Sequence, residues 1–391
     1  MKILTFSTLF PNSEKPGHGI FVETRLRHLA ASGQVEARVV APIPWFPSTN
    51  PRFGSYARFA KAPRHELRHG IAVSHPRYPV IPKIGMNLAP MLLAQAAKPT
   101  IARMIDEGYD FDLIDAHYFY PDGVAAAMLG RYFNKPLVIT ARGSDITLFP
   151  QYALPRRMIM WAARRADAVI TVCNALRDEV VALGVDAGRV VSLRNGVDLE
   201  LFRPTERTPN DLFTLLAVGH LVPVKAQDLI IGALPLLPGV RLVLAGDGPD
   251  RMKLEALARE LKVGERVTFL GAVPQAQLRS HYGAADALVL SSSREGWANV
   301  LLEAMACGTP VVASRVYGTP EVVAAPEAGV LMGERSYQGV ADAVNALRAH
   351  YPDRAATRRY AERFSWDDTT KGQLHLFDKV LASRATTLSL A

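Results

Sequence analysis

The sequence has few cysteines and no long uninterrupted apolar run. Cys173 and Cys307 are its only cysteines, and both stand among apolar neighbours. Two such cysteines support neither a disulfide framework nor a cysteine-based zinc site, so they fit a reducing compartment such as the cytoplasm. The longest apolar region, residues 84–105, is interrupted by two prolines, a lysine and an arginine, which argues against a membrane-spanning helix.

The N-terminus lacks the pattern of a secretory signal. Its short apolar run, residues 3–9, is broken by proline and polar residues at positions 11–14 before any cleavage-site pattern appears. We therefore predict that residues 3–9 belong to a first β-strand. No repeat or low-complexity tract appears, and a chain of 391 residues with 49% hydrophobic residues can bury two cores.

Short apolar runs that end in glycine-rich or polar turns recur along the chain, and helical spacing follows several of them. This alternation is typical of α/β proteins with parallel sheets. Residues 203–211 combine two prolines with mixed charges and are predicted to link two domains. The predicted strands cover residues 2–9, 35–41, 111–115, 136–140, 168–172, 190–193, 213–218, 241–245, 267–270, 287–290 and 310–313.

The most informative stretch is residues 287–323, in which two carboxylates stand eight positions apart around a turn. Glu295 follows a predicted buried strand, and Glu303 lies about one turn into the helix that comes next. Asn299 is the predicted N-cap of this helix, and Gly308 stands where a left-handed cap would end it. We expect Glu295 and Glu303 to face one crevice at the carboxyl ends of the strands.

Such a crevice suits a nucleotide diphosphate that carries a sugar. A helix N-terminus offers backbone N–H groups and a partial positive charge to phosphate. An ionised carboxylate accepts strong hydrogen bonds from neutral hydroxyls, so one glutamate can hold sugar hydroxyls and the other a ribose. The alternative is that Glu303 is a solvated helix residue and Glu295 a loop charge.

The segment REGWANVLLEAMACGTPVVAS, followed by YGTPEVV, resembles the donor-site signature of retaining family-four glycosyltransferases of the GT-B fold. The family usually has Gly-Phe-Gly-Leu after the first glutamate. The variant found here is similar to the branch that builds bacterial teichuronic-acid-type and exopolysaccharide chains. The resemblance implies that Glu295 contacts the transferred sugar and Glu303 the ribose. It also implies that the diphosphate meets backbone amides of Gly296, Trp297, Ala298, Asn299 and Val300.

A second loop, residues 219–225, starts with Gly219-His220 and ends with Lys225. Relatives commonly have Gly-Arg-Leu here, with a lysine five residues after the arginine, and the two cations clamp the departing diphosphate. Lys225 matches this pattern and His220 does not, although a histidine near phosphate can donate a hydrogen bond or become cationic. Lys225 could otherwise be a surface lysine. The loops at Gly248 and Val273 are predicted to meet the ribose and the base, with ordinary turns as the alternative.

The first half of the chain supplies weaker candidates. Gly17 and Gly19 form a loop after the first strand, and the resemblance implies that this loop faces the interdomain cleft near the phosphates of the donor and the acceptor. A plain turn is an equal alternative, because the third glycine of a dinucleotide fingerprint is absent. His117 ends a predicted strand, and the resemblance implies that it hydrogen-bonds the donor sugar, whereas a lone histidine is often structural. Arg142 and Asp145 follow the next strand and are predicted to meet the acceptor.

Together these features predict an α/β protein of the GT-B fold, with two Rossmann-like doubly wound domains around an interdomain cleft. Residues 1–205 would bind the acceptor, residues 206–365 the nucleotide-sugar donor, and residues 366–391 would form a helix that crosses back to the first domain. We expect retaining transfer of a sugar to an acceptor hydroxyl without a metal, since no Asp-x-Asp motif follows a strand. Alternatives are a nucleotide-sugar epimerase, a non-catalytic nucleotide-sugar binding protein and, least favoured, a nicotinamide oxidoreductase.

The charge of the chain is unevenly distributed. Residues 1–205 contain 25 Lys and Arg against 17 Asp and Glu, so the whole net charge of +8 lies in the predicted first domain. Residues 52–77 hold six of these cations and one acidic residue, and a solvated face is the simplest interpretation. We expect an anionic membrane or a lipid-linked glycan acceptor as partner, at the inner face of the cytoplasmic membrane. Nucleic acid is not expected, because no nucleic-acid module is present.

Overall fold

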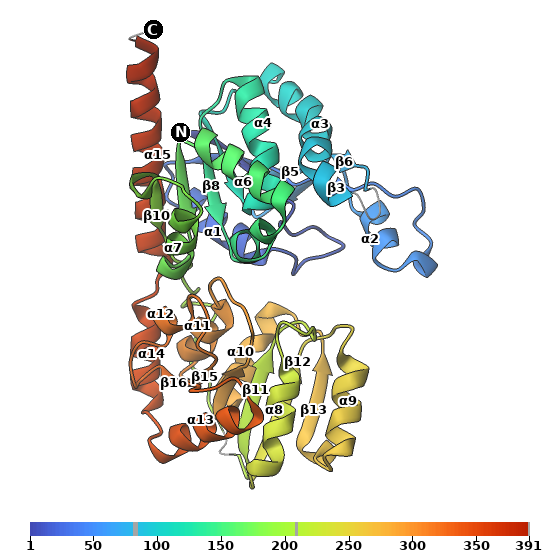
Figure 1. The fold of residues 1–391 in the computed structure, drawn as a ribbon, viewed down its shortest axis with the longest axis vertical. Coiled ribbons are helices and arrows are strands. Elements are labelled where there is room, and N and C mark those ends of the chain that lie inside the picture. Colours follow the sequence, from blue (N-terminus) through green and yellow to red (C-terminus); the bar gives the residue numbers. More distant parts are fainter. Residues whose placement is uncertain (81–84, 208–209, 390–391) are drawn as a thin grey trace. The chain divides into compact units, whose positions relative to one another are not determined.

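The computed structural model describes residues 1–80, 85–207 and 210–389, and it divides into two compact units (Figure 1). Unit 1 comprises Met1–Arg194 and Asp367–Ala391, and unit 2 comprises Asn195–Trp366. The chain therefore passes from unit 1 to unit 2 after residue 194, eleven residues before the predicted boundary after residue 205. It returns to unit 1 at residue 367, one residue after the predicted start of the C-terminal helix.

Unit 1 is built on an eight-stranded sheet with the order β10-β9-β8-β7-β1-β2-β5-β4. Its strands pair in parallel except for β4 and β5, which form an antiparallel hairpin. The strands β3 (Ile43–Pro44) and β6 (Arg77–Tyr78) pair separately. The strands of the main sheet are β1 (Lys2–Phe6), β2 (Glu36–Val40), β4 (His65–Arg68), β5 (Ile71–Ser74), β7 (Leu113–His117), β8 (Leu137–Ala141), β9 (Ala168–Thr171) and β10 (Val190–Ser192).

The predicted return of the C-terminal helix is confirmed. Helix α15 (Trp366–Ser389) packs Leu374, Phe377 and Val380 into the core of unit 1, where they meet apolar residues of β1, β2 and α1 (Ile20–Ala31). Burial of these side chains is the main force that holds the helix there. The other helices of unit 1 are α2 (Ser55–Lys61), α3 (Gly85–Asp106), α4 (Val124–Phe133), α5 (Ser144–Thr147), α6 (Ala153–Arg165) and α7 (Asn174–Ala182).

Unit 2 contains a six-stranded, fully parallel sheet with the order β13-β12-β11-β14-β15-β16. Its strands are β11 (Phe213–Val218), β12 (Val240–Ala245), β13 (Val267–Gly271), β14 (Ala287–Leu290), β15 (Val311–Ala313) and β16 (Gly329–Leu331). Five of these were predicted to within one residue at each end. The helices are α8 (Gln227–Ala233), α9 (Arg251–Glu260), α10 (Gln275–Ala284), α11 (Asn299–Ala306), α12 (Thr319–Val322), α13 (Tyr337–Ala349) and α14 (Arg354–Glu362).

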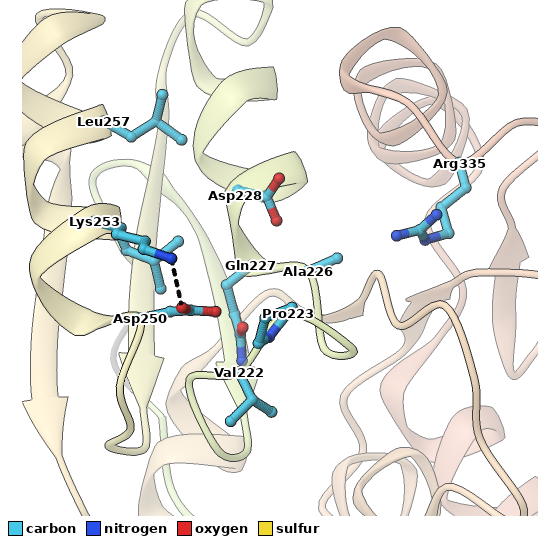
Figure 2. Close-up of a pocket in the computed structure, with 10 residues that line it drawn as sticks. Val222, Pro223, Ala226, Gln227, Asp228, Asp250, Lys253, Leu257 and Arg335 are labelled. Atoms are coloured by element: carbon cyan, nitrogen blue, oxygen red, sulfur yellow. Dashed lines mark ion pairs between the residues drawn. The ribbon is translucent and has the colours of Figure 1, made fainter. Parts of the chain in front are cut away.

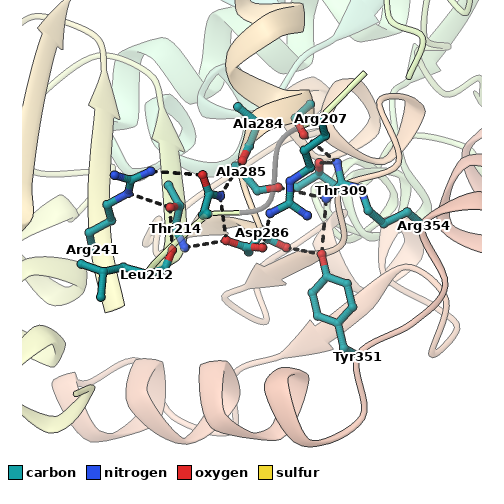
Figure 3. Close-up of polar contacts among 12 residues, drawn as sticks. Arg207, Leu212, Thr214, Arg241, Ala284, Ala285, Asp286, Thr309, Tyr351 and Arg354 are labelled. Atoms are coloured by element: carbon teal, nitrogen blue, oxygen red, sulfur yellow. Dashed lines mark hydrogen bonds and ion pairs between the residues drawn. The ribbon is translucent and has the colours of Figure 1, made fainter. Parts of the chain in front are cut away.

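The predicted linker is instead attached to unit 2 by a polar network at the amino end of β14 (Figure 3). The carboxylate of Asp286 accepts hydrogen bonds from Arg207, from the amide side chain of Asn210 at 3.0 Å and from the backbone N–H of Thr214 at 2.7 Å. Arg354 donates to the carbonyl groups of residues 283 and 285, each at 2.9 Å. These bonds explain why the described part of the segment belongs to unit 2.

No helix within residues 1–80, 85–207 and 210–389 combines the length and the apolarity needed to cross a bilayer. The longest apolar region of the sequence forms most of α3, which contains Pro90 and Pro99 within its span. One side of this helix is buried against unit 1, with Leu93, Ala97 and Ile101 at 0% exposure. In the part that the structure describes, this region thus forms a helix that packs on the core with one side.

Candidate functional site

In each unit the strand order reverses beside the first strand, which marks where an α/β sheet binds ligands. In unit 2, β11 lies between β12 and β14, and in unit 1, β1 lies between β2 and β7. The loops at the carboxyl ends of strands that flank such a reversal diverge and leave room for a ligand. The loops after β11 and β14, and those after β1 and β7, are therefore the places to examine.

In unit 2 this position is occupied by an ion pair between two predicted site residues. The Nζ atom of Lys225, on the loop after β11, lies 2.6 Å from Oε1 of Glu295, on the loop after β14. The two side chains are 27% and 11% exposed, so the pair is partly shielded from water. A backbone hydrogen bond of 2.8 Å from Ser293 to Val224 joins the same loops. The fold thus brings together two residues that are 70 positions apart.

The neighbouring glycine loops are shaped by close backbone contacts. A Cβ atom on Gly248 would lie 2.4 Å from the carbonyl oxygen of Leu221, and no L side chain fits there. Gly219 has a φ of +146°, which also favours glycine. His220 is exposed, and its Nδ1 lies 3.2 Å from the carbonyl oxygen of Asp247. These glycines are needed to pack the two loops, which supports the ordinary-turn alternative for Gly248.

The first turn of α11 lies directly after the Glu295 loop. The predicted N-cap was wrong by one position, because Ala298 is the cap and its side chain makes no capping hydrogen bond. Asn299 instead accepts a hydrogen bond of 3.2 Å from Asn195 through its side chain. Trp297 is 7% exposed and packs against Phe364, with ring centres 6.1 Å apart. An uncapped helix N-terminus is suited to an anion because its partial positive charge is not offset by a capping side chain.

Glu303 projects from α11 into a nearly buried position and is held by α10. Its Oε2 accepts a hydrogen bond of 2.7 Å from the hydroxyl of Tyr282, and its Oε1 one of 3.1 Å from Gln275. Burial raises the pKa of Glu303, and burial together with the nearby Glu303 raises that of Tyr282 well above 10. Tyr282 therefore stays protonated and donates. Each carboxylate oxygen can accept a second bond, so Glu303 can still hold a ribose hydroxyl.

Replacing Tyr282 by phenylalanine removes the hydrogen bond that fixes Glu303. We expect stability to fall by roughly 1–3 kcal/mol, because a buried carboxylate oxygen loses its donor. The affinity for a nucleoside diphosphate should fall several-fold. If Glu303 holds the ribose, the preference for the ribonucleotide over its 2′-deoxy form should also shrink. Thermal denaturation and calorimetric titration of both nucleotides measure these effects.

The matched control for this substitution is Tyr351→Phe, which removes a partly buried hydroxyl that bonds the backbone of Asp286 at 2.7 Å. It should cost stability without changing the nucleotide preference. If Tyr282→Phe and Tyr351→Phe behave alike in the nucleotide titrations, the ribose role of Glu303 is wrong.

In unit 1, His117 is the last residue of β7 and is 1% exposed. Its Nε2 lies 3.1 Å from Asp115 and its Nδ1 2.7 Å from Nη2 of Arg142. Since a guanidinium can only donate, Nδ1 must accept, and the ring is neutral with its proton on Nε2. Burial lowers the pKa of His117 to about 4. A bond from this ring to a sugar therefore requires the exchange of one of these two contacts.

The cluster around His117 extends to residues of two helices, α1 and α15, whose part in this site the sequence did not indicate. Gln373 of α15 donates to Asp115 at 3.0 Å and accepts from Nε of Arg25, on α1, at 2.8 Å. Arg25, Asp115 and Gln373 are each 1% exposed. The C-terminal helix thus contributes directly to the setting of His117. Asp115 could have been found from the sequence, because residues two apart on a strand face the same side.

Arg142 and Asp145 lie after β8, and the structure assigns them different tasks. Asp145 is fully buried and accepts backbone N–H groups of Phe119 at 2.7 Å, Gly143 at 2.7 Å and Arg142 at 3.0 Å. This carboxylate holds the loop together, and its role at the acceptor stays a prediction. Arg142 contacts His117, and burial lowers the pKa of Arg142 to about 9.

The loops after β1 and β7 are joined by Asp122. Its carboxylate accepts the backbone N–H of Thr8 at 2.8 Å and the hydroxyls of Thr8 and Ser7. Gly19, at the end of the first loop, has a φ of +69°, and a Cβ there would lie 2.2 Å from the carbonyl oxygen of Leu9. Gly17 is exposed and has open space around it. Only Gly19 is thus required by the local backbone.

Asp122 should make stability depend on pH. Burial raises its pKa from 3.8 to about 7, so between these values the folded protein keeps a proton that the unfolded chain releases. Its contribution is therefore fully present below about pH 4 and is lost as pH rises to about 7. Asp122→Asn cannot titrate, and the stability of the wild type relative to this variant should fall by about 1 kcal/mol per pH unit between pH 5 and 6.

Thermal unfolding of both proteins from pH 5 to pH 8.5 tests this slope. His117, whose low pKa works in the opposite direction between about pH 4 and 6.5, is present in both proteins and cancels in the comparison. A difference that stays constant across this range would show that Asp122 is ionised throughout.

A pocket of about 320 Å³ lies in unit 2, on the side of the Lys225 loop formed by α8 and α9 (Figure 2). Its wall includes Ala226, next to Lys225, and an ion pair of 3.5 Å between Lys253 and Asp250. Neither Glu295 nor Glu303 is among its lining residues. Val273, predicted to meet the base, is half-buried just before α10 and does not line the pocket either.

Comparisons with known families match almost the whole chain. Residues 17–201 match glycosyltransferase family 4, and residues 199–364 match the glycosyl transferases group 1. The putative teichuronic acid biosynthesis glycosyltransferase TuaC of Bacillus subtilis is 30% identical over 358 residues, which cover 88% of each chain. The D-inositol 3-phosphate glycosyltransferase of Mycobacterium bovis is 32% identical over 327 residues, or 75% of this chain and 67% of that one.

Two solved structures show the same architecture. Sucrose-phosphate synthase from Thermosynechococcus elongatus superposes with a TM-score of 0.80 at 22% identity and covers 98% of this chain and 99% of its own. HepE from Anabaena, in complex with UDP and glucose, gives a TM-score of 0.70 at 23% identity, with 100% of both chains covered. At this identity the similarity concerns the fold, and it confirms the predicted GT-B arrangement of two Rossmann-like units.

Proposed function

The chain belongs to the family-four glycosyltransferases of group 1, and we propose that it moves a sugar from a nucleoside diphosphate to an acceptor hydroxyl with retention of anomeric configuration. The observation that carries this proposal is the Lys225–Glu295 pair at the switch point of unit 2. It stands beside the uncapped start of α11, from which Glu303 also projects. The cation and the helix N-terminus suit a diphosphate, and the two carboxylates suit the hydroxyls of a sugar and of a ribose.

In the proposed reaction the bond between the anomeric carbon and the diphosphate breaks, and its electron pair leaves with the phosphate oxygen. The acceptor oxygen bonds the same face of that carbon, and its proton passes to the departing phosphate. Lys225 stabilises the charge that grows on the leaving group. Glu295 and His117 orient the donor sugar, so neither forms a covalent intermediate. Arg142 is the proposed contact for an anionic acceptor.

We propose that no metal takes part, because Lys225 and the start of α11 supply the positive charge that the leaving group needs. Within the described residues, no group of three or more His, Cys, Asp or Glu side chains is arranged to hold a metal ion. Loss of activity with a chelator, followed by recovery with magnesium or manganese, would contradict this proposal.

We propose a cell-surface polysaccharide or glycolipid as the product, because TuaC is described as a teichuronic acid biosynthesis enzyme. A UDP-sugar is the first donor to test, since HepE was solved with UDP and glucose. The acceptor is proposed to be a sugar or a lipid-linked glycan, and the enzyme to work in the cytoplasm at the inner membrane face. The basic character of residues 1–205 supports an anionic partner.

A thermal-shift screen of nucleoside diphosphate sugars identifies the donor, because a ligand raises the melting temperature according to its affinity. Proton NMR of the reaction with the best donor and a lipid-linked acceptor then reports the anomeric configuration of the product. Retention supports the proposal and inversion overturns its mechanism. Conversion of the nucleotide sugar without an acceptor would indicate an epimerase, and binding without nucleotide release a non-catalytic protein.

A further inference from the structure

Unit 1 exposes a group of aromatic side chains on the segment between β3 and β4. Trp45 is 56% exposed, Tyr56 is 47% exposed and Phe53 is 36% exposed. Phe46 lies against two of them, with ring centres 5.2 Å from those of Phe53 and of Tyr56. Phe53 and Tyr56 thus gather around Phe46, and Trp45 precedes it in the chain. Large apolar side chains gathered on a surface indicate a contact with another phase or molecule.

Exposed cations are interspersed with these rings. Arg52, Arg58, Lys61 and Arg64 are all exposed, and residues 45–65 contain no Asp or Glu. We call these four cations, together with Trp45, Phe53 and Tyr56, the aromatic–basic patch. The guanidinium of Arg52 lies 4.7 Å from the ring centre of Phe53, so charge and ring are presented together.

The cations in and around the patch repel one another. Burial and the charge of Arg58 lower the pKa of Lys15, whose Nζ lies 3.8 Å from the ring centre of Phe59. Burial and the charge of Arg64 likewise lower the pKa of Arg77. Positive groups that crowd together are stabilised by an external anion.

The patch also has a defined support on unit 1. Helix α2 buries Ala57 at 2% exposure, and Ala62 just after it is 5% exposed. The side chain of Arg77, on β6, donates to the backbone carbonyl of Ala62. Figure 1 shows α2 at the margin of unit 1, beside β3 and β6 and away from the strands of the main sheet. The exposed rings are thus carried on a structured element.

We propose that the aromatic–basic patch docks unit 1 on an anionic lipid bilayer, with the rings in the interface and the cations at the head groups. Trp and Tyr are suited to this boundary because one end of each ring is apolar and the other polar. Arg and Lys attract anionic lipids. An attachment through these side chains is peripheral.

This inference rests on the proposed function, since it places the acceptor domain where a lipid-linked acceptor lies. It also restricts the expected contact surface to the exposed cations of the basic stretch 52–77. Arg68 is held by Glu23 at 2.6 Å, and Arg77 is only partly exposed and bonds Ala62. These two arginines therefore stabilise unit 1 instead of facing a partner.

The test is co-sedimentation of the full chain with vesicles of phosphatidylcholine alone or with 30% phosphatidylglycerol, in about 0.1 M salt. The wild type should bind only the anionic vesicles. The variant Trp45→Ser/Phe53→Ser/Tyr56→Ser keeps every charge and should bind at least tenfold more weakly. In the variant Arg52→Gln/Arg58→Gln/Lys61→Gln, the affinity for anionic vesicles should fall about 100-fold, and most of the salt dependence of binding should disappear.

Matched control variants make the same chemical changes elsewhere. Tyr132→Ser/Tyr337→Ser removes two exposed rings, and Arg259→Gln/Lys262→Gln/Lys371→Gln removes three exposed charges. Both should bind vesicles like the wild type. Lipids with brominated chains should quench tryptophan fluorescence in the wild type and not in Trp45→Phe.

Equal binding of the patch variants and the wild type would overturn the proposal, as would no wild-type binding to anionic vesicles. Binding to a single-stranded oligonucleotide without binding to lipid would identify a different polyanion and also overturn it. The thermal shift that UDP causes, measured on every variant, tests nucleotide binding independently of vesicle binding. A protein that sediments with vesicles but does not respond to nucleotides would contradict the transferase proposal alone.

Discussion

Replacement of Glu295 by glutamine is expected to lower kcat by about 100-fold or more while leaving the fold intact. The substitution keeps the shape of the side chain but removes the charge that meets Lys225 at 2.6 Å. A neutral amide accepts weaker hydrogen bonds from sugar hydroxyls than a carboxylate does, and it also presents a donor where an acceptor is needed. The donor sugar would then be held less firmly in its reactive position.

The measurement is nucleoside diphosphate release with the donor found by the thermal-shift screen, together with calorimetric titration of UDP. Because UDP carries no transferred sugar, its affinity should change only a few-fold in Glu295→Gln. The control is Glu265→Gln, an exposed glutamate in the turn before β13, which should behave like the wild type. Unchanged kcat in Glu295→Gln would remove the central residue of the proposed site.

The organisation of unit 2 could be predicted well from the sequence. The strands that carry its loops are short apolar runs between turn residues, and β14 was predicted at its observed bounds. The order of parallel strands then follows from the fold implied by the resemblance, and it places Lys225 and Glu295 at one edge. Gly308, predicted as a left-handed cap, has a φ of +79°. Local signals and the overall fold agree in this unit.

Unit 1 was harder to predict because its site depends on long-range contacts. The contact of His117 with Arg142 and the chain from Asp115 through Gln373 to Arg25 join four elements, and no local pattern encodes such partners. Arg25 looks like a surface residue of an amphipathic helix, yet it is 1% exposed because α15 covers it. Burial of a charged side chain by a distant helix becomes visible only once the fold is known.

The partners of Glu303 illustrate a middle case. Gln275 and Tyr282 are seven residues apart, so they lie on the same face of α10, and this spacing can be read from the sequence. What the sequence does not show is that this face meets α11 at Glu303. The sequence can therefore predict that Gln275 and Tyr282 share one helix face. Their contact with Glu303 becomes visible only when the packing of α10 on α11 is known.

The pairing of Lys225 with Glu295 also compensates two charges in a partly shielded position. A lone cation or a lone carboxylate in a partly shielded position is costly, whereas the pair neutralises both. When a diphosphate binds, Lys225 gains a second anionic partner, and Glu295 can turn toward neutral hydroxyls. The two residues therefore act together, and their substitutions should not have independent effects.

The second large effect is expected for Lys225→Ala, which should lower kcat by about 100- to 1000-fold and change the donor KM much less. The positive charge of Lys225 meets a diphosphate whose negative charge grows as the sugar departs, so it stabilises the transition state more than the bound donor. Steady-state kinetics with the identified donor measure both constants. Lys253→Ala is the control, because this neighbouring lysine on α9 is 80% exposed and pairs with the nearby Asp250.

The double variant Lys225→Ala/Glu295→Gln tests the coupling of the pair. In Lys225→Ala the carboxylate of Glu295 loses the cation at 2.6 Å and repels an incoming diphosphate, so UDP affinity should also fall. Removing that charge in the double variant should restore part of the UDP affinity while kcat stays low. Strictly additive losses in UDP affinity would mean that Lys225 and Glu295 do not act on the same bound nucleotide. Unchanged kcat in Lys225→Ala would exclude Lys225 from the transfer step.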